Sequence, residues 1–230
     1  SQVAAAGQDD DAASRVALNE LCGKYWRPVY AFIRHLGRSP HDAEDLTQTY
    51  FSRLLGRDYL RRADREKGRF RAFLIRDLKF FLGDESDKRL AEKRGGRLAI
   101  FSLDMDMAER LHETVEAASI DPEAYFDRQW ALDTVRLAKE EVAARYGRQG
   151  KERIFSLLQS GLVHTPDAGT YEKWSEASGM NPGALKVALH RLRDRFRRAL
   201  EEQILQTVAS EEDLKEEMKY LFRALARAAG

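Results

Sequence analysis

The sequence predicts an all-α protein made of two helical domains, and three observations lead to this prediction. Apolar residues recur at helical spacing in nearly every segment, strand-like alternation does not persist, and β-branched residues are sparse. Of the 230 residues, 43% are hydrophobic and 33% are charged, so the chain has enough apolar side chain to bury a core. An acidic stretch divides the chain, and we expect it to be a flexible linker that leads to a helix-turn-helix domain.

Helix signals and composition place the expected boundaries. Residues 1–14 are rich in Ala and Asp and are predicted to be a disordered tail. The first helical domain is expected at 15–96, the acidic linker at 97–121, the helix-turn-helix domain at 122–205 and a helical extension at 206–230.

Standard start and stop residues mark the first two helices. The first is predicted at 16–36, with Pro28 as a kink or restart and Gly37 at its end. Residues 39–42 (SPHD) then combine an N-cap serine, a proline at the first helical position and an acid in the first turn. The second helix is therefore expected to run from Asp42 to Gly56.

A third helix is predicted from about Arg69 to Leu82, with basic residues continuing to Arg94. Phe70, Phe73 and Phe81 lie on its apolar stripe, so the core is the favoured place for them. Phe80 lies off this stripe, which makes it the best candidate for an aromatic side chain with a function.

The second domain is predicted to hold several helices of different lengths. The expected helices are a long one that begins at 121–123 and ends near 146, a short one at 154–162, a short one at 170–178 with Thr170 as N-cap, a long one at 184–204 and a C-terminal one at about 211–228. A tight turn at 179–183 (GMNPG) separates the third and fourth of these.

The charges are arranged in blocks, although the net charge is only +1. Residues 61–97 hold 13 basic and 7 acidic side chains, and residues 184–200 hold 6 basic and 1 acidic. The segment 102–141 holds 4 basic and 11 acidic side chains, and 201–219 holds 2 basic and 7 acidic. Nucleic-acid phosphates would attract the basic blocks and be repelled by the acidic ones. The alternative for any single block is an ordinary solvated helix face.

A short helix, a glycine-containing turn and a basic helix follow one another at 170–204, which is the helix-turn-helix arrangement. Small residues in the first turns of the basic helix allow a close approach to the major groove, and its cations can reach phosphates or base edges. On local sequence alone, a helical hairpin with a charged face stays an equal alternative. The candidate DNA-contacting residues are Thr170, Asn181, Gly183, Ala184, Lys186, His190, Arg191 and Arg193.

Several stretches, in this order, resemble the extracytoplasmic-function (ECF) family of bacterial sigma factors. Residues 42–51 (DAEDLTQTYF) resemble the family's region two, whose helix docks on the clamp of RNA polymerase. Residues 67–74 (KGRFRAFL) resemble the start of the strand-opening segment, and 171–193 resemble the promoter-reading region four. The tail at 204–225 resembles an acidic helical extension of one subgroup.

The resemblance implies a protein that binds core RNA polymerase, reads two elements of promoter DNA and helps to melt it. An anti-sigma factor is a further candidate partner. The implied polymerase-binding residues are Asp42, Glu44, Asp45, Gln48, Thr49 and Ser52. The implied DNA-binding residues of the melting segment are Arg69, Arg71, Lys79, Phe80, Lys88 and Arg89.

The sequence departs from the family pattern in two places. Many members have an Arg-Asn pair where this chain has Lys79 and Phe80, which affects the identity of the melted sequence. Ser175 and Ser178 stand where Ala and Leu are usual, and a serine at a core position weakens packing.

The sequence contains no residue pattern that predicts an enzyme. The five histidines lie far apart without metal-ligand spacing, and no phosphate-cradling glycine loop is present. Cys22, the single cysteine, lies on an apolar helix and is expected in the core. We therefore expect no metal, no cofactor, no membrane insertion and a cytoplasmic location.

Two alternatives to a sigma factor stay open. One is a free-standing helix-turn-helix regulator that binds duplex DNA without polymerase. The other is a sigma-like adaptor that reads no DNA, which the two serines motivate. In the sigma-factor role, the acidic C-terminal helix could cover the Arg-rich helix at 184–204 as an autoinhibitory lid.

Overall fold

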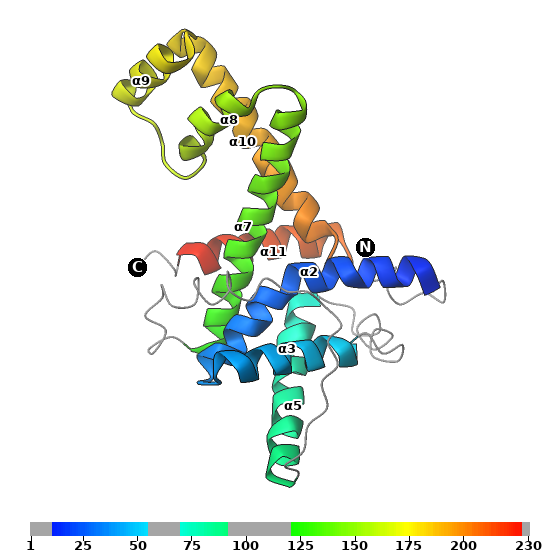
Figure 1. Cartoon of the computed structure of the whole chain (residues 1–230). Helices are drawn as coiled ribbons and strands as arrows, with labels where there is room; N and C mark the ends of the chain where they lie inside the picture. Colours follow the sequence, from blue (N-terminus) through cyan, green and yellow to red (C-terminus); the bar gives the residue numbers. More distant parts are fainter. Residues whose placement is uncertain (1–10, 55–69, 92–120, 227–230) are drawn as a thin grey trace. The chain divides into compact units, whose positions relative to one another are not determined.

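The computed structural model describes residues 11–54, 70–91 and 121–226, with side chains described for 21–54, 70–86 and 121–226. Within these ranges the chain is helical and has no strand, which confirms the all-α fold class (Figure 1). The described helices are α2 (Asp11–His35), α3 (Pro40–Leu54), α5 (Phe70–Ala91), α7 (Pro122–Arg148), α8 (Glu152–Leu158), the 3-10 helix η2 (Gln159–Leu162), α9 (Ala168–Ser178), α10 (Pro182–Leu205) and α11 (Glu211–Ala226).

The chain divides into two compact units. The first unit comprises Ser1–Asp133 and Ile204–Gly230, and the second comprises 134–203. The second unit is therefore an insertion in the sequence of the first, and the chain passes between them once within α7 and once within α10. The expected linker at 97–121 lies outside the described residues except for Asp121, so the functional division at this point stays a prediction.

The ends of α2 and α3 follow the signals in the sequence. Helix α2 continues through Pro28, and Gly37 ends it with a φ of +80°, a conformation that glycine adopts without strain. Helix α3 begins at Pro40, and the Asp42 amide donates to the Ser39 hydroxyl oxygen at 3.1 Å. Ser39 is thereby confirmed as the N-cap, and the helix starts two residues before the predicted start at Asp42.

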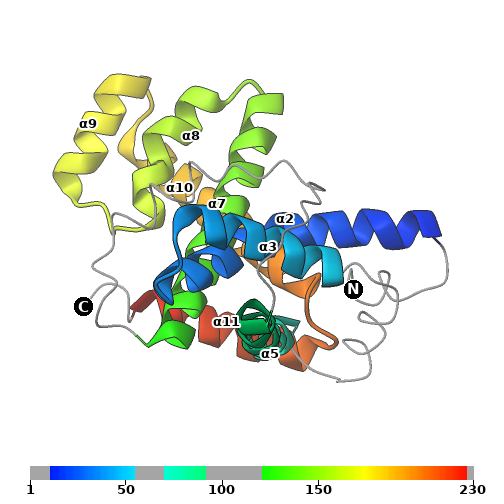
Figure 2. The same ribbon diagram turned by 60° about the horizontal axis from the view of Figure 1, so that its bottom comes forward.

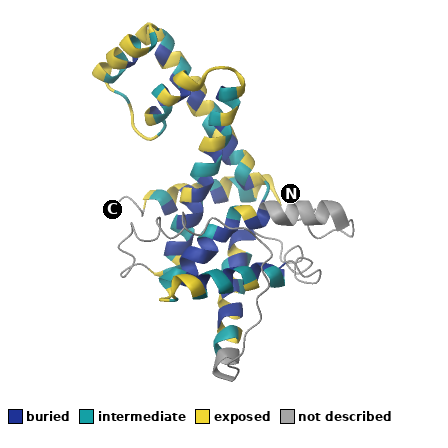
Figure 3. Cartoon of the chain, in the orientation of Figure 1, coloured by how far each residue is buried: buried dark blue, intermediate teal, exposed yellow. Residues whose placement is uncertain are grey.

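Aromatic side chains hold the core of the first unit together. Tyr50 of α3 packs against Phe81 of α5 with ring centroids 5.3 Å apart, and its hydroxyl donates to the Leu74 carbonyl oxygen at 3.2 Å. The first turns of α7 pack on α2, where the rings of His35 and Tyr125 stack at 4.5 Å. Figure 3 shows the buried residues concentrated where these helices meet.

The C-terminal helix α11 belongs to the first unit, and Figure 2 shows it beside α5. The Phe70 amide at the start of α5 donates to the Thr207 carbonyl oxygen at 3.2 Å, and Arg71 Nε donates to Glu217 Oε1 at 2.7 Å. The buried acid of this helix, Glu217, thus pairs with α5. The expected lid over the Arg-rich helix stays a prediction.

The second unit contains α9 and most of α10, the two helices of the predicted helix-turn-helix. Asp167 caps α9 by accepting from the Thr170 amide at 2.8 Å, so the prediction of Thr170 as N-cap is wrong by three residues. Gly179 ends α9 in the left-handed conformation with a φ of +70°. Asn181 Oδ1 then accepts from the Ala184 amide at 2.8 Å and caps α10.

A close approach at Gly161 joins η2 to the helix-turn-helix core. A Cβ atom at this position would lie 2.8 Å from Leu189 Cδ1 and 3.1 Å from Trp174 Cη2. Both neighbours are buried core residues of α10 and α9. Only glycine therefore fits at this position without displacing the packing between the two helices.

We expect Gly161→Ala to lower the free energy of unfolding of the second unit by about 1 to 3 kcal/mol, because the added methyl group overpacks the core. Gly169→Ala is the matched control, since its new Cβ would meet only Asp167 Oδ1, at an ordinary contact distance of 3.9 Å. Urea unfolding followed by Trp fluorescence measures both. Equal stability of the two variants would show that the Leu189 and Trp174 side chains yield at no cost.

Candidate functional site

Helix α3 presents a polar face opposite its buried stripe. Glu44, Asp45, Gln48 and Ser52 are half-buried and Thr49 is exposed. Gln48 Nε2 donates to Glu44 Oε1 at 3.3 Å, which orders the amide and the carboxylate side by side. The α3 face, as we call these five residues together with Asp42, is therefore acidic, partly ordered and suited to a basic partner.

Hydroxyl groups on the α3 face bond to the backbone of their own helix. Thr49 Oγ1 donates to the Asp45 carbonyl oxygen at 2.7 Å, and Ser52 Oγ donates to that of Gln48 at 2.8 Å. Asp42 accepts from the Ser39 hydroxyl at 2.8 Å, which completes the cap of the helix. The carboxylates of Glu44 and Asp45 thus carry most of the charge that this face can offer to a partner.

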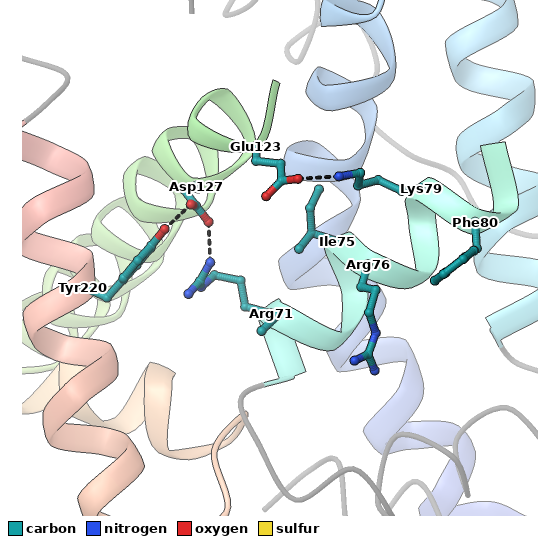
Figure 4. A pocket seen from close by; sticks show the side chains of 9 residues that line it. Arg71, Ile75, Arg76, Lys79, Phe80, Glu123, Asp127 and Tyr220 are labelled. Atoms are coloured by element: carbon teal, nitrogen blue, oxygen red, sulfur yellow. Dashed lines mark hydrogen bonds and ion pairs between the residues drawn. The ribbon is translucent and has the colours of Figure 1, made fainter. Parts of the chain in front are cut away.

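A pocket of about 610 Å³ opens beside α5, between this helix, the start of α7 and α11. Figure 4 shows the side chains that surround it. Its lining combines cations, acids and aromatic rings from three elements of the first unit: Arg71, Ala72, Ile75, Arg76, Lys79, Phe80, Glu123, Asp127 and Tyr220.

Arg71 lies at the inner end of this pocket and is 6% exposed. Besides its bond to Glu217, it pairs with the carboxylate of Asp127, and its guanidinium lies 4.0 Å from the ring centroid of Tyr220. Burial opposes the charged form, but the hydrogen bond and charge of Glu217 and the charge of Asp127 raise the pKa of Arg71 above its ordinary value. The predicted DNA contact by Arg71 is therefore not available in this conformation.

Tyr220 completes this ion cluster. Its hydroxyl donates to the second carboxylate oxygen of Asp127. Burial, together with the hydrogen bond to Asp127, raises the pKa of Tyr220 above its ordinary value. We call Arg71, Asp127, Glu217 and Tyr220 the Arg71 cluster.

Lys79 and Phe80 lie at the outer rim of the pocket. The Lys79 ammonium pairs with the Glu123 carboxylate, and both side chains are about half exposed. The hydrogen bond to Glu123 and the charge of that residue raise the pKa of Lys79. Phe80 is 68% exposed while Phe70 and Phe81 are buried, as predicted, whereas Phe73, also expected in the core, is only half-buried.

Three predicted contacts of the melting segment lie outside the described side chains. Arg69 precedes the described part of α5, and Lys88 and Arg89 lie within the helix but their side chains are not described. Their proposed contacts with DNA stay predictions.

The first turns of α10 present an exposed polar face. Lys186, His190 and Arg191 are exposed, as is Asn181 before the helix. Lys186 Nζ lies 5.6 Å from the ring centroid of Tyr171, and His190 Nδ1 lies 3.3 Å from Asp194 Oδ2. We call Lys186, His190 and Arg191 the α10 face. Gly183 is exposed and Ala184 is half-buried beside it.

Three of the predicted DNA-contacting side chains make bonds within the second unit. Arg193 donates to the Gly161 carbonyl oxygen at 2.7 Å through Nη2 and at 3.0 Å through Nε, and to that of His164 at 3.3 Å. Thr170 Oγ1 donates to the capping carboxylate of Asp167 at 2.6 Å, and Asn181 caps α10. Each of these side chains therefore has a structural role here, whatever it contacts in a complex.

The two unusual serines of α9 bond the backbone around the turn. Ser175 Oγ donates to the Met180 carbonyl oxygen at 2.7 Å, and Ser178 Oγ donates to that of Trp174 at 2.6 Å. The Met180 amide donates in turn to Ser178 Oγ at 3.3 Å. Both residues are half-buried, so neither hydroxyl is left unsatisfied. The expected weakening of the packing at these positions stays a prediction.

The sequence analysis did not predict that Asp127, Glu217 and Tyr220 surround Arg71. Glu217 lies 146 residues from Arg71, and Asp127 lies 56 residues away. Periodicity reports which face of one helix is apolar and carries no information about pairing at such separations. The one available signal was a charged residue directly after Phe70 on a helix whose stripe is otherwise apolar.

The described residues offer little for catalysis or metal binding. Burial raises the pKa of the Cys22 thiol to about 12, so the thiol stays protonated and unreactive. In the ranges that the structure covers, no group of three or more His, Cys, Asp or Glu side chains is placed to hold a metal ion. Among the same residues, no helix has the length and apolar character that crossing a bilayer requires.

The comparisons with known proteins identify one domain. Residues 21–80 match the family model of Sigma-70 region 2, which spans the second half of α2, all of α3 and the first half of α5. The match supports a sigma factor family and a sigma-factor-like role in transcription initiation, in which region 2 is the non-enzymatic domain that binds core RNA polymerase. No curated protein and no solved structure matches the chain.

We expect Glu217→Gln to lower the free energy of unfolding of the first unit by about 3 kcal/mol. Breaking a buried ion pair usually costs about 3 to 5 kcal/mol. We expect the lower end of this range, because Asp127 still compensates part of the Arg71 charge. Glu212→Gln is the control, since this acid is exposed on the same helix and should change stability by less than about 0.5 kcal/mol. Chemical denaturation measures both, and equal midpoints would show that the Arg71 cluster contributes nothing.

Proposed function

We propose that this chain is a sigma factor of the ECF type, which binds core RNA polymerase, reads two promoter elements and assists strand opening. The observation that carries the proposal is the region 2 match at 21–80, which contains the α3 face. The second unit adds support, because α9, the Gly179 turn and α10 have helix-turn-helix form and display basic residues.

The α3 face is the proposed polymerase-docking surface. Its carboxylates Glu44 and Asp45 are half-buried on a helix whose other side is fixed in the core by Tyr50 and Leu54. Pre-ordered charges lose little side-chain entropy on binding, and acidic groups attract a basic partner surface. These properties fit a docking helix better than a solvated one.

Helix α5 is the proposed contact with melted DNA. Phe80 exposes 68% of its surface beside Lys79, and an exposed ring next to a cation is the usual platform on which an unpaired base stacks. Arg69, Lys88 and Arg89 stay proposed contacts on the same segment. Arg71 is left out, because its charge is already satisfied within the chain.

The α10 face is the proposed reader of the second promoter element. Lys186, His190 and Arg191 project from the first three turns, and exposed Gly183 allows close approach to the DNA. Arg191 is the best candidate for a base contact, because a guanidinium bonds guanine through two donors.

The experiment that tests the proposed function is transcription in vitro with bacterial core polymerase on a promoter library. A sigma factor directs initiation from a subset of templates that share two spaced elements. Specific binding of a palindromic duplex without polymerase would favour the free-standing regulator. Polymerase binding without initiation on any template would favour the adaptor.

We expect the triple variant Glu44→Ala, Asp45→Ala and Gln48→Ala to bind core polymerase at least about tenfold more weakly, because it removes the charges of the α3 face. The control, Glu211→Ala with Glu212→Ala, removes two exposed acids of α11 and should bind as the unchanged chain does. Fluorescence anisotropy with labelled protein measures both. Unchanged affinity of the triple variant would place the docking surface elsewhere.

We expect Lys186→Ala with Arg191→Ala to lower the affinity of the chain for its promoter duplex and to reduce the slope of log K against log salt by about 2, one for each lost phosphate contact. If Arg191 reads a base, the Arg191→Ala variant also loses sequence preference at one position. Arg198→Ala is the control, because this exposed cation lies about two turns beyond Arg191 on α10. An unchanged slope in the double variant would contradict the assignment of the α10 face.

A further inference from the structure

We propose that carboxylates of α7 and α11 compete within the chain with nucleic acid for the cations of α5, so that the free protein masks its own melting surface. This inference rests on the proposed function, since it concerns the regulation of the same α5 surface. The competing groups are Glu123 and Asp127 of α7 and Glu217 of α11, and the masked cations are Lys79 and Arg71.

The masking acids come from outside the matched region 2 domain. The match ends at residue 80, whereas Glu123 and Asp127 follow the predicted linker and Glu217 lies in the C-terminal helix. Glu123 and Asp127 line the pocket beside α5 (Figure 4), and Glu217 bonds Arg71 at its inner end. The chain therefore supplies from two later segments a set of negative charges for a surface that its region 2 domain carries.

The carboxylates occupy the positions that phosphates would take. An oxygen of Glu217 lies 2.7 Å from Arg71 Nε, and Asp127 and Glu123 bond directly to Arg71 and Lys79. These are the charge-assisted contacts by which Arg and Lys bind a phosphate. With Arg76, which also lines the pocket, three cations face three acids, so this part of the surface offers a polyanion little net positive charge until an acid is displaced.

The mask has an outer and an inner layer. Lys79 and Glu123 are about half exposed, and both also line a second hollow of about 270 Å³ next to Leu36 and Pro122. Water and salt reach this pair from two sides, so it exchanges readily with a phosphate. In the Arg71 cluster, Arg71 and Glu217 are buried while Asp127 and Tyr220 are half-buried, and the bond from the Tyr220 hydroxyl to Asp127 joins α11 to α7 there. The outer pair is therefore the layer that nucleic acid displaces first.

Phe80 stays accessible to nucleic acid although the cations beside it are paired. Its ring stays 68% exposed at the pocket rim, so the acids leave the stacking platform open and block only the cations beside it. A single strand can then stack weakly on Phe80 but gains the neighbouring phosphate contact only after Glu123 has moved away. The mask thus lowers affinity for nucleic acid in general without closing the surface.

The test uses the full chain and a labelled single-stranded DNA of mixed sequence at low salt. We expect Glu123→Gln to bind this probe about three- to tenfold more tightly than the control Glu212→Gln, which makes the same charge change on an exposed residue of α11. Adding Lys79→Gln to Glu123→Gln should abolish the gain, because the released cation is then absent. Adding Asp127→Asn to Glu123→Gln should increase it further.

Two results would overturn the mask. One is equal binding by Glu123→Gln and Glu212→Gln, and the other is a gain that persists when Lys79 is also replaced, since that gain would come from net charge alone. Thermal unfolding of each variant identifies affinity changes that follow from loss of the fold. Polymerase-dependent initiation by the unchanged chain is measured separately, so the proposed function can hold while the mask fails, or fail while intrachain competition holds.

Discussion

The first unit depends on the neutralisation of one buried cation, Arg71. A guanidinium withdrawn from water is tolerated only where acids and hydrogen bonds compensate it, and here Glu217 and Asp127 do so from two different helices. The nearby Thr207 carbonyl accepts the first amide of α5, so the C-terminal segment also completes the start of that helix. The matched domain ends at residue 80, yet its structure is completed by Asp127 and by Thr207 and Glu217, the last two more than a hundred positions later.

The same unit carries two candidate surfaces on helices that share one core. Tyr50 belongs to α3, yet its ring packs on Phe81 and its hydroxyl bonds the Leu74 carbonyl of α5. The α3 face and the exposed ring of Phe80 therefore project from a common set of buried contacts, and neither helix can rotate without disturbing the other. A partner that binds the α3 face consequently meets α5 in a fixed orientation.

Local signals in the sequence predicted local structure well. Ser39 and Pro40 marked the start of α3, the glycine at 179 marked the end of α9, and helical periodicity separated buried Phe81 from exposed Phe80, because each depends on residues within one or two turns. The cap of α9 was misplaced because Asp167 and Thr170 are both good capping residues and lie three positions apart. The Arg71 cluster could not be predicted, because its members meet only through the tertiary fold.

Counting basic residues overestimates the charge that this chain offers to nucleic acid. In the second unit Arg193 donates to two backbone carbonyl groups and holds the segment before α9, while Arg191, two positions earlier on the same helix, points to the exposed side. In the first unit, the charge of Arg71 is likewise paired within the chain, with Asp127 and Glu217. A basic block in a sequence therefore contains cations of two kinds, those that fix the fold and those that reach a partner. Only contacts with the rest of the chain distinguish the two kinds. Exposure and pairing, rather than the summed charge of the block, therefore identify Lys186 and Arg191 as the cations that can reach a partner.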